Sequence, residues 1–197
     1  MRKTMNLKTK KQELLDTLYA PFKNCVACPL GSLGRTTIVF GEGNPDAQLM
    51  FVGEAPGANE DAQGRPFIGK SGQLLTKLLN LAGIQREDVF ITSIVKCRPP
   101  KNRAPLPIES GTCKKLLLFN QIKIIQPQVI CTLGSVSLAG LLETPVQITK
   151  IRGNPIAWNG LTLLPTYHPA YILRNPKELK TLFGDLETAI SLIKKTQ

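Results

Sequence analysis

The chain has 197 residues, 42% hydrophobic and 20% charged, which suits one globular domain with its own core. Its formal net charge of +11 favours a polyanionic partner, such as nucleic acid or an anionic membrane surface. No apolar stretch is long enough to span a bilayer, and the odd number of cysteines, five, argues against a disulfide framework.

The N-terminal segment is basic and lacks a continuous apolar core of signal-peptide length, so we expect a cytoplasmic protein. Leucines at helical spacing predict a first helix over residues 7–20. The basic N-terminal segment, residues 1–11, is expected to be a disordered, solvated tail that adds at most non-specific attraction to DNA. A turn-rich segment follows this helix.

Four apolar runs read as buried strands, and helical patterns separate them. Continuous apolar runs of this kind, alternating with helices, indicate a mainly parallel sheet with helices on both faces. We therefore predict an α/β fold with three layers, α/β/α, around a mainly parallel four-stranded sheet, as a single domain over 1–197. The predicted strands lie within 47–53, 88–95, 127–134 and 160–169, and the later helices within 71–83, 107–125, 135–142 and from 175 onward.

Capping residues set the expected ends of two of these helices. Ser71 is a candidate N-cap and Gly83 a stop for the helix after the first strand. Asn175 is expected to cap the last helix, with Pro176 in its first turn and Glu178 reaching back to the cap. A proline-rich loop separates the second strand from the helix that follows it.

Polar residues gather where each predicted strand ends. Ligands of open parallel sheets bind outside the carboxyl ends of the strands, so these residues predict a binding site. The first strand leads into GEAPGANED, the second contains Ser93, Lys96 and Cys97 near its end, the third leads into LGS, and the fourth leads into TYHPAYILR, which carries the one histidine, His168.

Four of the five cysteines are candidate metal ligands. Cys25 and Cys28 form a C-x-x-C pair, whose spacing suits zinc, an iron–sulfur cluster or redox chemistry. Cys97 ends a strand among basic residues that would favour its thiolate, and Cys113 lies where it could meet Cys97 across the proline loop. By count the four suit zinc or a four-iron cluster equally, and four unrelated thiols remain the alternative. Cys131, inside an apolar strand, reads as a core residue.

Three motifs resemble those of the type-4 uracil-DNA glycosylases. They are GEAPGANEDAQGRPFIGKSGQLL, VFITSIVKCRPPKNRAP and YHPAYILRNP, and the upstream C-x-x-C completes the pattern. The resemblance covers nearly the whole chain, from about Tyr19 to the last helix. It implies a uracil-glycosylase fold and a four-iron, four-sulfur (4Fe–4S) cluster of structural role. The ligands that it implies are Cys25, Cys28, Cys97 and Cys113.

The resemblance also implies a uracil pocket. Gly53, Glu54 and Ala55 would form the first loop, Phe67 would stack on uracil, and His168 would face the uracil O2 and stabilise the departing anion. On their own, Phe67 could equally be a core residue and His168 a plain loop residue.

The implied reaction is hydrolysis of the bond between uracil and deoxyribose after the nucleotide flips out of the duplex, which leaves an abasic site. More active relatives carry an aspartate where Ala55 stands, so Glu54 is the candidate for positioning water. Glu60 and Asp61 are the other nearby carboxylates, and they could equally be solvated loop charges. No lysine is evidently placed as a Schiff-base nucleophile, so we expect a monofunctional glycosylase.

Ser93 departs from the family pattern, which usually has asparagine there. An asparagine amide can donate to uracil O4 and accept from N3–H at once, whereas serine offers one hydroxyl. We therefore expect weakened uracil activity or a broader base preference, unless a small shift of the pocket lets serine suffice.

The expected partner is uracil-containing DNA, single- or double-stranded, bound by a monomer that does not use a membrane. A replication or repair protein could recruit it. Two alternatives are a DNA-binding iron–sulfur protein of the same fold with little or no glycosylase activity, and an iron–sulfur or zinc protein with a sensing role. The candidate DNA contacts are Lys96, Arg98, Lys101, Arg103 and Arg174.

Overall fold

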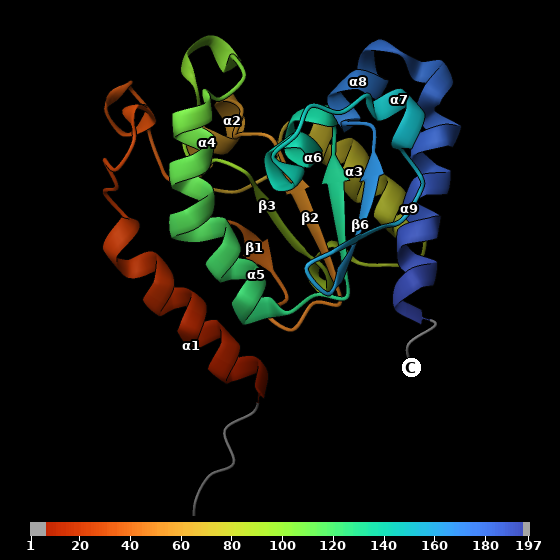
Figure 1. The fold of residues 1–197 in the computed structure, drawn as a ribbon, viewed down its shortest axis with the longest axis horizontal. Coiled ribbons are helices and arrows are strands. Elements are labelled where there is room, and N and C mark those ends of the chain that lie inside the picture. The colour runs from red at the N-terminus through yellow and green to blue at the C-terminus, as the bar shows by residue number, and fades with distance from the viewer. Residues whose placement is uncertain (1–6, 195–197) are drawn as a thin grey trace, which may run out of the picture.

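Buried apolar runs form the centre of a six-stranded sheet with the order β1-β3-β2-β4-β6-β5 (Figure 1). The computed structural model describes residues 7–194. The four central strands are parallel, as predicted, and a short antiparallel strand closes each edge. The strands are β1 (Glu42–Gly43), β2 (Leu49–Gly53), β3 (Phe90–Ser93), β4 (Val129–Leu133), β5 (Ile156–Trp158) and β6 (Leu161–Thr166).

Helices cover both faces of the sheet because successive strand residues point to opposite sides. In β2, Met50 and Val52 face a core made with α1, α5 and α6, while Leu49 and Phe51 face a core made with α3, α8 and α9. This confirms the three-layer α/β/α class. The helices are α1 (Leu7–Tyr19), α2 (Ala58–Gln63), α3 (Lys70–Leu81), α4 (Pro107–Cys113), α5 (Phe119–Ile125), α6 (Ser135–Leu142), α7 (Ile148–Ile151), α8 (Pro169–Arg174) and α9 (Leu179–Lys194).

One predicted cap is wrong, and another is confirmed in position only. Gly69 occupies the N-cap of α3, which begins at Lys70, so Ser71 lies inside the helix. Asn175 does precede the last helix, with Pro176 in the first turn of a 3₁₀ segment, Pro176–Glu178, that leads directly into α9. Its side chain makes no cap bond, because its amide donates to the Tyr171 carbonyl oxygen at 3.0 Å.

The predicted helix over 107–125 is divided. A π-helical segment, Lys114–Leu118, separates α4 from α5 and begins directly after Cys113. The Lys114 ammonium there donates to the Gly140 carbonyl oxygen at 2.5 Å and to Glu143 at 2.9 Å. Single π-helical turns are often retained at functional positions.

The prediction of a disordered tail is wrong for residues 7–11, which belong to α1. Lys11 lies 2.5 Å from the Asp46 carboxylate and 2.9 Å from the Ile125 carbonyl oxygen. Residues 1–6 lie outside the described part of the chain. Over residues 7–194, no helix combines the length and apolar character needed to cross a bilayer.

Candidate active site

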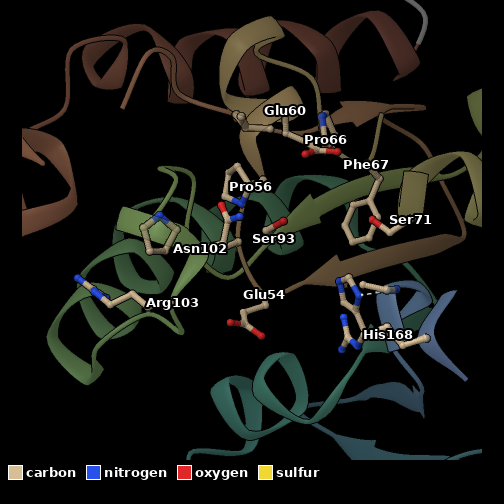
Figure 2. A pocket seen from close by; sticks show the side chains of 16 residues that line it. Glu54, Pro56, Glu60, Pro66, Phe67, Ser71, Ser93, Asn102, Arg103 and His168 are labelled. Carbon is tan, nitrogen blue, oxygen red and sulfur yellow. Dashed lines mark hydrogen bonds between the residues drawn. The ribbon is translucent and has the colours of Figure 1, made fainter. Parts of the chain in front are cut away.

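A pocket of about 450 Å³ opens at the carboxyl ends of the parallel strands (Figure 2). Its walls come from the segments that follow β2, β3 and β6, which are the segments that carry the sequence motifs. The sequence-predicted residues that line it are Glu54, Ala55, Phe67, Ser93, Arg103, His168 and Arg174.

The Phe67 ring forms one wall and packs directly on the backbone of β2. A Cβ atom at Gly53 would lie 2.5 Å from Phe67 Cζ and 3.4 Å from Ser93 Oγ, so Gly53 leaves the space that the ring occupies. The ring centroid lies 5.6 Å from that of His168, with 35° between the planes. Phe67 therefore belongs to the pocket, although its exposed fraction of 7% resembles that of a core residue.

His168 presents one ring nitrogen to the pocket. Its Nδ1 accepts a hydrogen bond from the Ala170 amide at 3.1 Å, so a neutral ring carries its proton on Nε2. The pKa of His168 is lowered to about 4, mainly by burial and also by the nearby Arg174 cation. A neutral imidazole at neutral pH follows, with Nε2–H as a fixed donor.

Ser93 ends β3 opposite Gly53 and lines the floor of the pocket. Beneath it, Lys96 is only 1% exposed and donates to the Ser93 carbonyl oxygen at 2.7 Å and to the Thr92 hydroxyl. Burial lowers the pKa of Lys96 to about 7. The prediction that Lys96 contacts DNA is therefore wrong, since its ammonium points into the protein.

Among the carboxylates, Glu54 is the one whose side chain stands half-buried in the pocket without a hydrogen-bond partner in the described residues. Burial raises the pKa of Glu54. Glu60 and Asp61 are buried, which excludes the alternative that they are solvated loop charges. Glu60 accepts from the Gly69 amide at 2.8 Å, and Asp61 accepts from backbone amides of the segment before β1.

Sequence reasoning missed Asn102, which lines the pocket from the proline loop. Its backbone is left-handed, with φ of 56°, a conformation that asparagine tolerates better than most residues. Its side-chain oxygen accepts from the Arg98 guanidinium at 2.8 Å. In the sequence, Asn102 stands between two cations of the motif CRPPKNR, whose charge pattern predicts DNA contacts and gives no sign of the asparagine's role.

The remaining candidate cations differ in how they are held. Arg103 forms a two-bonded ion pair with the buried Glu109, at 2.7 and 2.8 Å. Lys101 and Arg174 are exposed beside the pocket, and Arg98 is half-buried. Lys101 and Arg174 are the cations left available to an external anion.

The four candidate cysteines gather at one end of the core that α1 and α5 share. Cys97 is buried there, and Cys25, Cys28 and Cys113 pack against the same cluster. The pKa of the Cys97 thiol is raised to about 12, mainly by burial and also by the neighbouring thiols. Burial therefore outweighs the basic neighbours that were expected to favour its thiolate. Within residues 7–194 no three His, Cys, Asp or Glu side chains form a site for a single metal ion. Cys131 lies in the opposite core, as predicted.

Comparison with known proteins agrees with the site. The Uracil DNA glycosylase superfamily matches residues 40–187. The type-4 uracil-DNA glycosylase of Thermotoga maritima is 50% identical over 189 residues, which cover 94% of this chain and 97% of the relative. That of Saccharolobus solfataricus is 44% identical over 180 residues, covering 87% and 82%. A type-5 uracil-DNA glycosylase of Thermus thermophilus is 34% identical over 52% of each chain. The chain therefore belongs to the uracil DNA glycosylase superfamily and, within it, to the type-4 uracil-DNA glycosylases.

Proposed function

We propose that this protein hydrolyses the N-glycosidic bond of uracil in DNA and leaves an abasic site. The observation that carries this proposal is the pocket in which an aromatic ring, a neutral histidine donor and one unpaired carboxylate converge. A flipped base fits such a site because the ring can stack on its face while the polar groups meet its edge. Membership of the type-4 family supports the same substrate.

In the proposed reaction the bond between C1′ and N1 breaks and its electron pair moves onto uracil. The Nε2–H of His168 donates to the developing charge at O2, where a preorganised donor lowers the barrier. Water bonds to C1′ through its oxygen, and Glu54 orients it and accepts its proton. The raised pKa of Glu54 makes this carboxylate a better proton acceptor. No lysine of the described chain lines the pocket, which favours a monofunctional enzyme.

The test is a glycosylase assay on single-stranded and duplex oligonucleotides with one uracil, in which alkali cleavage reveals abasic sites. We expect uracil release from both. If the protein binds these oligonucleotides but releases no base, it is instead a DNA-binding member of the fold.

We propose further that Ser93 weakens the recognition of uracil. Ser93 brings one short hydroxyl to the pocket floor, where the family resemblance implies an amide. We expect Ser93→Asn to raise the rate of uracil release about tenfold, the value of roughly one net hydrogen bond. Hypoxanthine and thymine mismatches serve as competing substrates. Equal rates for the two proteins on every substrate would contradict this proposal.

We propose that Cys25, Cys28, Cys97 and Cys113 hold a 4Fe–4S cluster. The donor set fits such a group, since the four thiols gather on one cluster of core residues. Each cysteine binds a different iron, so the ligands of a cluster stand farther apart than those of one zinc ion. When bound, the group would join the N-terminal loop to the segment after β3 and to the end of α4. Iron and acid-labile sulfide analysis of the purified protein tests the assignment.

A further inference from the structure

Phe67 holds its place in the pocket with a strained backbone. Its φ is 49°, in the left-handed region, which is costly for a residue with a bulky side chain. Such a conformation persists only where the surroundings impose it. Part of the constraint comes from α3, because a Cβ atom at Gly72 would lie 1.8 Å from the Phe67 carbonyl oxygen.

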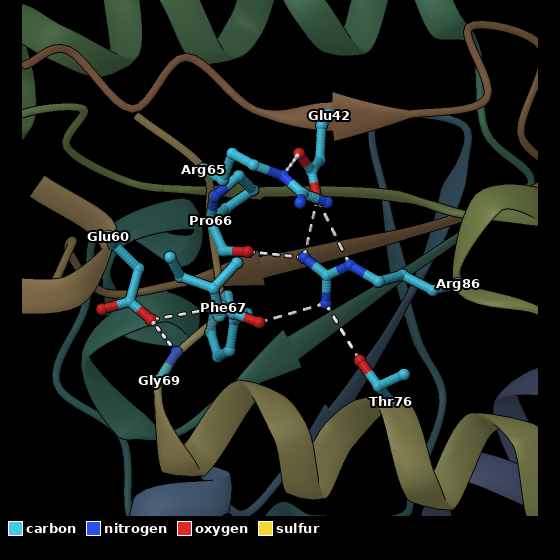
Figure 3. Close-up of polar contacts among 9 residues, drawn as sticks. Glu42, Glu60, Arg65, Pro66, Phe67, Gly69, Thr76 and Arg86 are labelled. Atoms are coloured by element: carbon cyan, nitrogen blue, oxygen red, sulfur yellow. Dashed lines mark hydrogen bonds and ion pairs between the residues drawn. The ribbon is translucent and has the colours of Figure 1, made fainter. Parts of the chain in front are cut away.

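One guanidinium holds both peptide groups that flank Phe67 (Figure 3). Arg86 donates through Nη2 to the Pro66 carbonyl oxygen at 2.5 Å and through Nη1 to the Phe67 carbonyl oxygen at 3.1 Å. The φ and ψ angles of a residue are the rotations that relate its two flanking peptide planes. Fixing both carbonyl groups therefore fixes both backbone angles of Phe67.

Arg86 is itself anchored from other elements. It lies in the 3₁₀ turn before β3 and donates to Glu42 of β1 at 3.0 Å and to Thr76 of α3 at 3.2 Å. Glu42 is also bound by Arg65, at 2.8 Å. On the other side of the loop, Glu60 accepts from the amides of Ile68 and Gly69, which Figure 3 also shows.

Arg86 does not line the pocket that would receive the base, and neither do Glu42 and Thr76. Among the described residues, Arg86 binds this motif through the main-chain oxygens of Pro66 and Phe67 alone. Its effect on a base would therefore pass through Phe67. We infer that Arg86 is a positioning residue that holds the Phe67 ring against Gly53 as a preformed stacking surface. This inference rests on the proposed function and on the stacking role of Phe67.

The first test compares two variants with a control that shares their partner. Arg86→Gln removes the planar fork, and Arg86→Lys keeps a positive charge for Glu42 but cannot reach two carbonyl groups in one plane. Arg65→Gln is the control, because Arg65 binds Glu42 and its guanidinium does not contact the two carbonyls. We expect both Arg86 variants to lower single-turnover uracil release by about 10- to 100-fold, the cost of a misplaced binding group. The control should stay within about twofold. Full activity of Arg86→Lys would overturn the inference.

A double-mutant cycle separates positioning from general stability. In a Phe67→Ala background the ring is absent, so Arg86→Lys should then change the rate less than about twofold. Equal effects of Arg86→Lys with and without the ring would show that Arg86 acts elsewhere.

A crystal structure of Arg86→Lys provides a readout that does not depend on activity. We expect Phe67 to leave the left-handed region and its ring to withdraw from Gly53. An unchanged Phe67 would refute the positioning role even in a protein that releases no uracil. Absence of release from the parent protein alone would count against the proposed function instead.

Discussion

At the scale of residues, the state of His168 follows from one backbone hydrogen bond and from burial. The Ala170 amide occupies Nδ1, and burial lowers the pKa to about 4 from the ordinary value of 6.5. Protonation would place an N–H on Nδ1 facing the Ala170 N–H, and this hydrogen bond would be lost. The folded protein therefore favours the neutral ring. The histidine that the motif singled out is thus held as a neutral donor.

The first prediction concerns stability and pH. Because the folded pKa of His168 lies below 6.5, the unfolded chain takes up this proton first as the pH falls. The free energy of unfolding should therefore decrease from pH 7 to about pH 4 through this group, and the dependence should vanish in His168→Gln. Urea unfolding of both proteins across this range isolates the His168 contribution, since the carboxyl groups of the protein contribute equally to each. A difference that does not change with pH would contradict the assigned neutral state.

The second prediction concerns Gly53, whose missing side chain makes room for the Phe67 ring. In Gly53→Ala the new methyl group would overlap the ring, at 2.5 and 2.6 Å from two of its carbon atoms. We expect a loss of about 1–3 kcal/mol in unfolding free energy, as for other overpacked sites. We also expect slower uracil release, because the displaced ring could no longer stack on the base. Gly184→Ala in α9 is the control, because a Cβ atom there meets nothing within 4 Å. Retained activity in Gly53→Ala would show that the ring can move without cost.

At the scale of elements, the proline loop beside the pocket is held by its own side-chain contacts. Arg98 binds Asn102, Arg103 binds Glu109, and the Glu109 carboxylate also accepts from the Leu106 amide at 2.7 Å. Since these cations already have partners, the loop offers fewer free charges to phosphate than its composition suggests.

The third prediction compares the contributions of exposed Lys101 and buried Lys96 to DNA binding. Lys101→Ala should reduce the slope of log K against log salt for DNA binding by about 1, the contribution of one phosphate contact. Lys96→Met should leave the slope unchanged, because Lys96 is buried beneath Ser93. Fluorescence polarisation with a uracil-free oligonucleotide at several salt concentrations gives both slopes. A reduced slope for Lys96→Met would mean that this side chain reaches DNA.

At the scale of the whole molecule, the fold separates three tasks. The parallel sheet brings the ends of β2, β3 and β6 to one pocket, while the cysteines gather beside the core that α1 and α5 share. The net charge of +11 is expected to hold the protein near DNA without selecting a sequence. The cysteine group would connect segments that are distant in the chain, so its loss should affect the entire domain.

The fourth prediction uses two cysteines with different surroundings. Cys97→Ala should abolish bound iron and lower the melting temperature, because the group would no longer join its loops. Cys131→Ala should keep the iron and cost only about 1 kcal/mol, the loss of a small buried group in the opposite core. Iron analysis and thermal unfolding of both variants check this. Equal iron content in the two proteins would exclude Cys97 as a ligand.

The sequence by itself determined the fold class, the four parallel strands and the family. Strands such as β2 and β4 consist of local apolar runs, and the motifs are contiguous, so short stretches of sequence carry this information. The two edge strands were not predicted because β1 and β5 have only two and three residues and are not buried.

Only the tertiary structure decided where the charged side chains point. Lys96 and Lys101 lie in one basic stretch, yet one is buried and the other exposed. The chain bends after β3, and this bend turns Lys96 back toward Thr92 and the Ser93 carbonyl oxygen. Arg86 reaches Phe67, nineteen residues earlier in the chain, only after β3 pairs with β1 and β2. Such contacts depend on which elements become neighbours in space, and the local sequence around Lys96 or Arg86 does not predict these neighbours.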